Sequence, residues 1–264
     1  MTIVARDLTL RLGAKPVLNG VSFTARAGEL TAIVGPNGCG KTTTLKVVAG
    51  DIRKAGDVTL FGRPIESFKP WELALRRGVL AQHTVIAFPF TVREIVGMGV
   101  TAGTGARSSG QESRAIEKAL EAVDLSGFAG RFYQELSGGE QQRVQLARVL
   151  CQVSEPVRDG EPAFLLLDEP VSSLDIRHQL SIMALARRFA DAGGGVIAIM
   201  HDLNLTAMYA DHVVMMRAGR IEAAGHPKRV FTDETMLSVF GCGMRVGVPP
   251  RDGVPFILPQ TAVH

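Results

Sequence analysis

A glycine-rich segment near the N-terminus has the residue types and spacing of a phosphate-binding loop. It reads Gly35-Pro36-Asn37-Gly38-Cys39-Gly40-Lys41-Thr42, and Thr43 follows it. Glycines let backbone N–H groups converge on an anion, because they adopt conformations that a Cβ disfavours. The lysine can reach the outer phosphates of a nucleotide, and the Thr42 hydroxyl can ligate Mg²⁺. We therefore predict that residues 35–43 bind a nucleotide polyphosphate.

The elements around this loop must place it at the start of a helix. Leu30–Val34 is a short apolar run that predicts a buried strand. Lys41–Ala49 contains neither glycine nor proline and is followed by Gly50, a typical residue after a helix end. A strand, a glycine loop and a helix N-terminus in this order form an anion site.

A second motif also predicts a helix start that can bind phosphate. It reads Leu136-Ser137-Gly138-Gly139-Glu140. Ser137 and Glu140 have the spacing of a capping box, and a helix is predicted to run on to Leu150. The two glycines leave the first-turn N–H groups bare at the positive end of the helix dipole. One chain cannot easily bring this site to its own glycine loop, so we infer that it serves a partner chain; the alternative is a well-capped surface helix.

The two motifs together resemble the ATP-binding-cassette (ABC) ATPases, whose signature motif is Leu-Ser-Gly-Gly-Gln/Glu. The resemblance spans nearly the whole chain. It implies ATP and Mg²⁺ as cofactors, with Leu136–Glu140 contacting the ATP of a second copy. Residues 163–167 resemble the family's apolar strand before two acids, here Asp168 and Glu169. Asp168 can hold the Mg²⁺ shell while Glu169 polarises the attacking water.

Three further segments match the family in order. The apolar run Val196–Met200 predicts a strand that delivers His201, at the place of the family's γ-phosphate-sensing histidine. Gln82 stands at the Q-loop position, where the family couples Mg²⁺ and water to the transport partner. Ser172-Ser173-Leu174-Asp175 resembles the D-loop, which crosses the dimer interface. The resemblance thus implies a catalytic set of Lys41, Gln82, Glu169 and His201, and Mg²⁺ ligands Thr42, Gln82 and Asp168.

Composition excludes several other classes of protein. The net charge is +3 without a polybasic stripe, so no nucleic-acid partner is expected. No apolar stretch reaches the roughly 18 residues that span a bilayer, and no signal segment is expected. Cys39, Cys151 and Cys242 are odd in number and lack a C-x-x-C pair, which disfavours disulfides and zinc. Cys39 is interpreted as a small spacer in the loop; the alternative is a redox-sensing thiol.

The order of motifs predicts an α/β fold of the P-loop NTPase, ABC type, with a mixed sheet and an antiparallel N-terminal sheet. We expect a single domain over 1–264, with a catalytic core at 1–87 and 163–240. A helical subdomain is expected at 88–162 and an irregular tail at 241–264. Residues 101–110 are rich in small residues and predict a flexible stretch.

The sequences of three segments narrow the resemblance to importers of iron chelates, haem and cobalamin. Phe88–Val96 and Glu140–Arg148 resemble those proteins, and the long connection Cys151–Pro162 most resembles haemin importers' ATP-binding subunits. This implies a homodimer, two membrane permease subunits and, indirectly, a periplasmic binding protein, with this chain on the cytoplasmic face of the bacterial inner membrane. The usual aromatic residue for adenine is replaced by Leu12 or Arg11.

The alternatives keep part of this interpretation. The same motor could serve an iron–siderophore or cobalamin importer. A different class is a soluble, non-transport cassette ATPase that acts on nucleic acid or a protein complex. A nucleotide-binding regulatory subunit without turnover is disfavoured by the complete set of motif residues.

Overall fold

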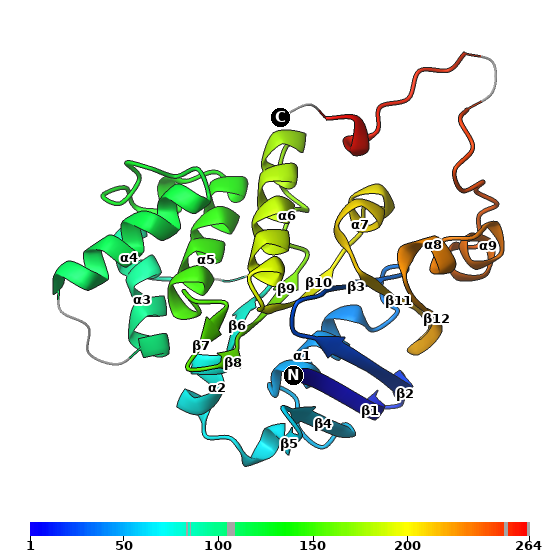
Figure 1. Ribbon diagram of the computed structural model, residues 1–264, viewed down its shortest axis with the longest axis horizontal. Helices are drawn as coiled ribbons and strands as arrows, with labels where there is room; N and C mark the ends of the chain where they lie inside the picture. Colours follow the sequence, from blue (N-terminus) through cyan, green and yellow to red (C-terminus); the bar gives the residue numbers. More distant parts are fainter. Residues whose placement is uncertain (83, 85, 105–108, 251–252, 263–264) are drawn as a thin grey trace.

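Two β-sheets and a group of helices form the framework of the chain (Figure 1). The computed structural model describes residues 1–82, 84, 86–104, 109–250 and 253–262. The first sheet is antiparallel and has the order β2-β1-β4-β5. Its strands are β1 (Thr2–Leu12), β2 (Lys15–Arg26), β4 (Asp57–Leu60) and β5 (Arg63–Pro64). This is the N-terminal antiparallel sheet that the sequence predicts.

The second sheet has six strands in the order β12-β11-β3-β10-β9-β6. Five of them run parallel, and β12 pairs antiparallel with β11 at one edge. The strands are β3 (Leu30–Val34), β6 (Arg77–Leu80), β9 (Phe164–Asp168), β10 (Gly195–Ile199), β11 (His212–Arg217) and β12 (Arg220–Gly225). The P-loop α/β fold with a mixed sheet is confirmed.

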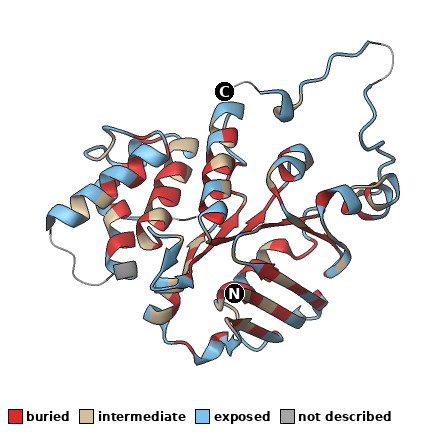
Figure 2. Ribbon diagram, viewed as in Figure 1, coloured by how far each residue is buried: buried red, intermediate tan, exposed pale blue. Residues whose placement is uncertain are grey.

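Both faces of the parallel sheet are buried (Figure 2). This explains why its strands are continuous apolar runs rather than alternating ones. In β9, Leu165 and Leu167 pack into one hydrophobic cluster, whereas Phe164 and Leu166 pack into another. The second cluster also holds the antiparallel sheet and helix α1 (Lys41–Ala49). The first holds α6 (Ile176–Asp191) and the helical group described next.

Three helices form a group on one side of the sheet (Figure 1). They are α3 (Val92–Thr104), α4 (Ser109–Ala122) and α5 (Gly138–Gln152). Their buried residues belong to the same hydrophobic cluster as one face of the sheet. The predicted helical insertion therefore shares its core with the rest of the chain, and its boundaries at 88 and 162 stay a prediction.

The stretch at 101–110 was expected to be flexible, and the residues described within it are helical. Residues 101–104 complete α3, and 109–110 begin α4, while 105–108 lie outside the described residues. The reason is tertiary packing: Val96 and Val100 on α3 are buried with α5, which outweighs the weak helix propensity of the small residues.

The remaining elements surround the sheets. They are the helices α2 (Pro70–Arg76), α7 (Leu203–Tyr209), α8 (Pro227–Val230) and α9 (Asp233–Phe240), the 3₁₀ turns at Ile65–Ser67, Tyr133–Glu135 and Pro259–Thr261, and a small hairpin of β7 (Val157–Arg158) and β8 (Glu161–Pro162). Among the helices described, none is long and apolar enough to cross a membrane. Beyond α9, the described residues 241–250 and 253–262 are irregular apart from the 3₁₀ turn, in line with the irregular tail expected there.

A matched pair of glycines in α3 tests the packing of the helical group. A Cβ on Gly99 would lie 2.0 Å from the Arg148 carbonyl oxygen on α5, whereas a Cβ on Gly97 meets only ordinary contacts beyond 3.4 Å. We expect Gly99→Ala to destabilise the protein by about 1–3 kcal/mol through overpacking. Gly97→Ala should be neutral or stabilising by up to about 1 kcal/mol. Urea unfolding midpoints measure both, and equal stability of the two variants would contradict the packing described.

Candidate functional site

The predicted site residues gather at the carboxyl edge of the parallel sheet. The glycine loop follows β3, Asp168 ends β9 with Glu169 after it, and His201 follows β10. Ligands of α/β sheets bind at this edge, because the strand ends and helix starts meet there. Segments more than a hundred residues apart in sequence therefore form one surface.

The glycine loop needs glycine where two strands crowd it. A Cβ on Gly35, at φ 149°, would lie 2.1 Å from the Met216 carbonyl oxygen of β11. A Cβ on Gly40, at φ 108°, would lie 2.9 Å from the Val17 carbonyl oxygen of β2. Both sheets thus hold the loop from behind. Its front is free to present backbone N–H groups to an anion.

Lys41 is folded back over the loop. Its Nζ donates hydrogen bonds to the carbonyl oxygens of Gly35 (2.8 Å) and Pro36 (3.1 Å), and the side chain is buried. A phosphate oxygen in the loop would offer the ammonium group a charged acceptor in place of these neutral ones, and charged hydrogen bonds are the stronger kind.

Thr42 and Asp168 place two oxygen atoms that could ligate a metal ion side by side. The Thr42 hydroxyl donates to Asp168 Oδ1 at 3.2 Å. Burial raises the pKa of Asp168 above its ordinary value, although the Thr42 hydrogen bond opposes that shift. Mg²⁺ is usually bound by only one or two oxygen ligands from the protein, because water molecules and substrate phosphates complete its coordination shell. A hydroxyl and a carboxylate beside a phosphate site fit this requirement. In the described part of the chain, no cluster of three His, Cys, Asp or Glu could hold a metal by protein ligands alone.

Glu169 and His201 form a direct pair. The distance between Glu169 Oε1 and His201 Nε2 is 2.6 Å. Glu169 has φ 53°, an uncommon conformation for a residue other than glycine, and strain of this kind concentrates at functional sites. The Glu169 carbonyl accepts from Gln142 Nε2 on α5 (2.8 Å). Glu169 is therefore held at two points: its carboxylate contacts His201, and its backbone carbonyl is bonded to α5.

A cavity of about 500 Å³ joins these groups, a size typical of small-molecule sites. Gln82 is exposed and lines this cavity together with a neighbouring one of about 170 Å³ that contains Thr42 and Asp168. The full lining of the larger cavity is Leu12, Lys15, Pro16, Val17, Asn37, Gly38, Gly40, Lys41, Thr42, Thr43, Gln82, Glu169 and His201.

The β1–β2 hairpin supplies one wall that the motifs do not predict. Lys15, Pro16 and Val17 line the cavity, and no local pattern distinguishes them from an ordinary strand. Of the two residues considered for adenine, Leu12 lines the cavity, whereas the Arg11 guanidinium donates to the Ala14 carbonyl (2.6 Å). The structure therefore favours apolar contact by Leu12 over guanidinium stacking.

The second motif starts α5 as expected but faces elsewhere. Ser137 caps the helix, and the Glu140 carboxylate accepts from the Ser137 N–H (2.8 Å) and hydroxyl (2.7 Å). Gly139 packs against Ser173 and Leu174 of the predicted D-loop, and Asp175 caps α6. Among the described residues that line the nucleotide cavity, none comes from Leu136–Glu140.

Cys39 is buried inside the loop. Burial raises the pKa of its thiol above the ordinary value, although nearby Lys41 opposes that shift. A raised pKa keeps the thiol protonated and unreactive. This favours the interpretation of Cys39 as a small spacer over a redox sensor.

Sequence comparison finds relatives over nearly the entire chain. Residues 18–172 match the family described as "ABC transporter". The chain is 66% identical to "Hemin import ATP-binding protein HmuV" of Rhizobium meliloti (strain 1021), over 98% of this chain and 99% of the relative. It is 56% identical to the protein of the same name from Mesorhizobium japonicum (strain LMG 29417 / CECT 9101 / MAFF 303099), over 99% of this chain and all of the relative.

Solved structures share the fold. "Dimeric Structure of MJ0796, a Bacterial ABC Transporter Cassette" matches with a TM-score of 0.74 and 25% identity, covering 85% of this chain and 98% of that one. "An inward-facing conformation of a putative metal-chelate type ABC transporter" also has a TM-score of 0.74, at 23% identity, covering 92% of this chain and 90% of that one. The first of these cassettes is a dimer.

The capping pair Ser137–Glu140 generates a pH-dependent prediction. Hydrogen bonds from Ser137 lower the pKa of the Glu140 carboxyl, so its stabilisation is complete above its unfolded value and is lost as pH falls through the lowered pKa. At pH 7, Glu140→Ala should cost about 0.5–2 kcal/mol, as caps do. Glu140→Gln keeps an acceptor and should stay within about 0.5 kcal/mol, while losing the acid dependence.

Urea unfolding from pH 7 down to pH 3 measures these effects. Glu117→Gln, at an exposed position on α4, is the matched control for removing one carboxylate. If Glu140→Gln and the wild type lost stability in parallel as pH fell, the capping role of the carboxylate would be wrong.

Proposed function

Because the chain belongs to the ABC transporter family of ATP-binding proteins, we propose that it is the ATP-hydrolysing subunit of a haemin importer. The observation that supports haemin as the cargo is the 66% identity to a haemin import ATP-binding protein over almost the full length of both chains. The geometry supports the hydrolysis, since a lysine and a glutamate–histidine pair line one cavity and a hydroxyl–carboxylate pair joins it to the neighbouring one.

In this proposal, residues 35–43 bind the ATP phosphates through backbone N–H groups. Lys41 exchanges its bonds to the Gly35 and Pro36 carbonyls for bonds to the outer phosphates. Thr42, Asp168 and Gln82 would hold Mg²⁺, which would supply neutralisation of the charge that develops on the phosphates. Leu12 and Val17 contact the base through apolar surface.

Glu169 orients the attacking water and accepts its proton. His201 contacts the Glu169 carboxylate at 2.6 Å and lines the same cavity, and in this proposal it contacts the γ-phosphate there. Because Gln142 is bonded to the Glu169 carbonyl, a shift of α5 reaches the backbone of Glu169 through one hydrogen bond.

The second half of the site comes from another copy of the chain. Residues 137–139 cap and begin α5, and they line no part of the nucleotide cavity described in their own chain. We place them on the ATP of a partner copy, head to tail, with the D-loop residues 172–175 beside the interface. The dimeric cassette of the same fold supports this arrangement.

Two membrane permeases and a periplasmic haemin-binding protein complete the proposed importer. The chain would sit on the permeases at the cytoplasmic face of the inner membrane, with contacts near Gln82 and residues 88–104. An iron–siderophore or cobalamin complex is the alternative cargo. A soluble cassette ATPase is the alternative class, and it predicts no association with membrane subunits.

Reconstitution tests this proposal. The chain is co-purified with the permeases encoded beside it, placed in liposomes and assayed for ATP hydrolysis with and without haemin-loaded binding protein. We expect the loaded binding protein to stimulate ATP hydrolysis. In Glu169→Gln the hydrolysis rate should fall by roughly 10²–10⁴-fold, the size typical of a lost general base. Glu117→Gln is the matched control and should hydrolyse ATP like the wild type.

Each result separates the alternatives. Stimulation by a siderophore or cobalamin complex instead of haemin would contradict haemin as the cargo, but it would agree with the proposed role as the ATP-hydrolysing subunit of an importer. Hydrolysis at the wild-type rate by Glu169→Gln would contradict the role of Glu169. Failure to associate with any membrane subunit would contradict the importer and favour the soluble ATPase.

A further inference from the structure

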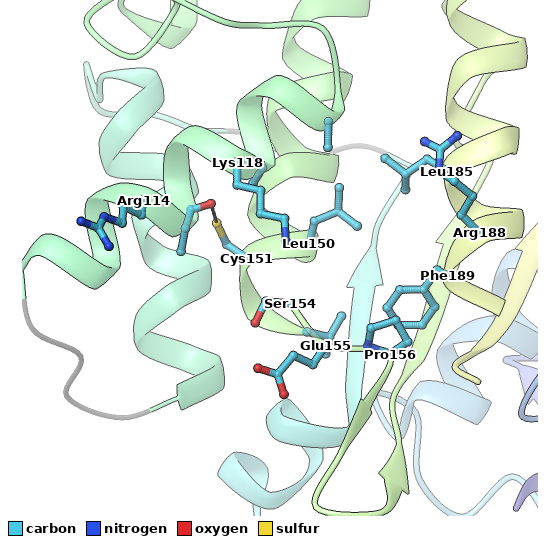
Figure 3. A pocket seen from close by; sticks show the side chains of 14 residues that line it. Arg114, Lys118, Leu150, Cys151, Ser154, Glu155, Pro156, Leu185, Arg188 and Phe189 are labelled. Atoms are coloured by element: carbon cyan, nitrogen blue, oxygen red, sulfur yellow. Dashed lines mark hydrogen bonds between the residues drawn. The ribbon is translucent and has the colours of Figure 1, made fainter. Parts of the chain in front are cut away.

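A second cavity, also of about 500 Å³, lies between the helical group and α6, outside the nucleotide site (Figure 3). Its walls come from α4, from the C-terminal end of α5, from residues 153–156 and from α6. Its volume is within the range of sites that bind small molecules. None of the residues that the nucleotide proposal uses lines it.

The walls of this cavity combine apolar surface with cations. Leu150, Pro156, Leu185 and Phe189 contribute apolar side chains, and the Phe189 ring lies beside Pro156 in Figure 3. The charged side chains are three cations, Arg114, Lys118 and Arg188, and one carboxylate, Glu155. Within the described chain, none of the three cations forms an ion pair. An apolar molecule with an anionic group matches this combination in both shape and charge.

Part of the cavity comes from a segment that ATP hydrolysis does not explain. The segment 153–162 that follows α5 contains no residue that the nucleotide proposal uses, and its first half supplies Val153, Ser154, Glu155 and Pro156 to the wall. Its second half is the β7–β8 hairpin, which Glu161 fastens to α2 through a 2.7 Å ion pair with Arg76. The hairpin thus fixes the cavity wall to the catalytic half of the molecule.

We propose that this cavity binds an amphipathic carboxylate of small-molecule size. Its apolar body would lie against Leu185 and Phe189, and its carboxylate would face Lys118 and Arg188. A porphyrin and a fatty acid share this chemistry. The proposal stands independently of the cargo, because binding is measured on this chain alone and without transport.

A ligand here would connect the far ends of two helices that matter at the nucleotide site. α5 is capped by Ser137 and reaches the cavity with Leu150, while α6 is capped by Asp175 and reaches it with Leu185. A ligand that fits the cavity as it stands stabilises this arrangement of the two helices. Any step that moves α5 against α6 then becomes slower, because the ligand must be strained or released.

Titration calorimetry of the full chain, without nucleotide, tests the site with protoporphyrin IX and with palmitate. We expect one of them to bind at one molecule per chain and more weakly as salt rises. Lys118→Ala and Arg188→Ala should each weaken binding by roughly 2–5-fold, the range of a partly exposed ion pair. Ala122→Trp, at an exposed lining position, should abolish binding by filling the cavity.

The matched control is Lys228→Ala, an exposed helical lysine on α8. Binding of protoporphyrin would assign the site to a porphyrin, and binding of palmitate would assign it to a lipid acid. Binding of neither probe, binding that persists in Ala122→Trp, or equal weakening by Lys228→Ala would overturn the proposal.

The rate of ATP hydrolysis tests whether a ligand in this cavity affects the nucleotide site through α5 and α6. At saturating probe the ATPase rate of the wild type should fall, and in Lys118→Ala the same fall should need a probe concentration higher by the factor measured for binding. An ATPase rate that does not respond to a bound probe would show that the cavity is not coupled to the nucleotide site.

Discussion

The parallel pairing of β3, β10 and β9 is the constraint on which the site depends. Ile199 pairs with Ile33 on one side and with Asp168 on the other, so the three strands end at the same level. A shift by one residue would turn every side chain of the strand to the opposite hydrophobic cluster. Because each face has its own core, this register is strongly determined, and with it the places of the glycine loop, Glu169 and His201.

The rest of the molecule connects this edge to the helical group. The shared hydrophobic cluster holds α5 against the sheet, and the hydrogen bond from Gln142 to the Glu169 backbone carbonyl joins that helix to the residue that we propose activates water. The start of α5 also packs on the D-loop through Gly139. A displacement of α5 therefore reaches the backbone of Glu169 over a short path, and the proposed cavity lies at the other end of the same helix.

The sequence predicts those parts of the fold whose signals are local. The glycine loop, the capped start of α5 and the buried strands depend on nearby spacing, and their elements are confirmed. The contact of Leu12 with the cavity could not be decided from sequence, because it requires the β1–β2 hairpin to fold over the loop. The helical state of residues 101–104 was missed for the same reason, since α5 supplies the packing. The roles of the individual site residues stay predictions.

The most direct test of the central claim, a nucleotide site shared by two copies, is a mixing experiment between two inactive variants. Lys41→Ala removes the lysine of the phosphate loop, and Ser137→Arg blocks the second motif. A mixed dimer restores one intact site, with Lys41 from one chain and Ser137 from the other. We expect ATPase activity to return on mixing, up to the share of mixed dimers. If the activity of the mixture does not exceed the sum of the two separate variants, the shared nucleotide site is contradicted.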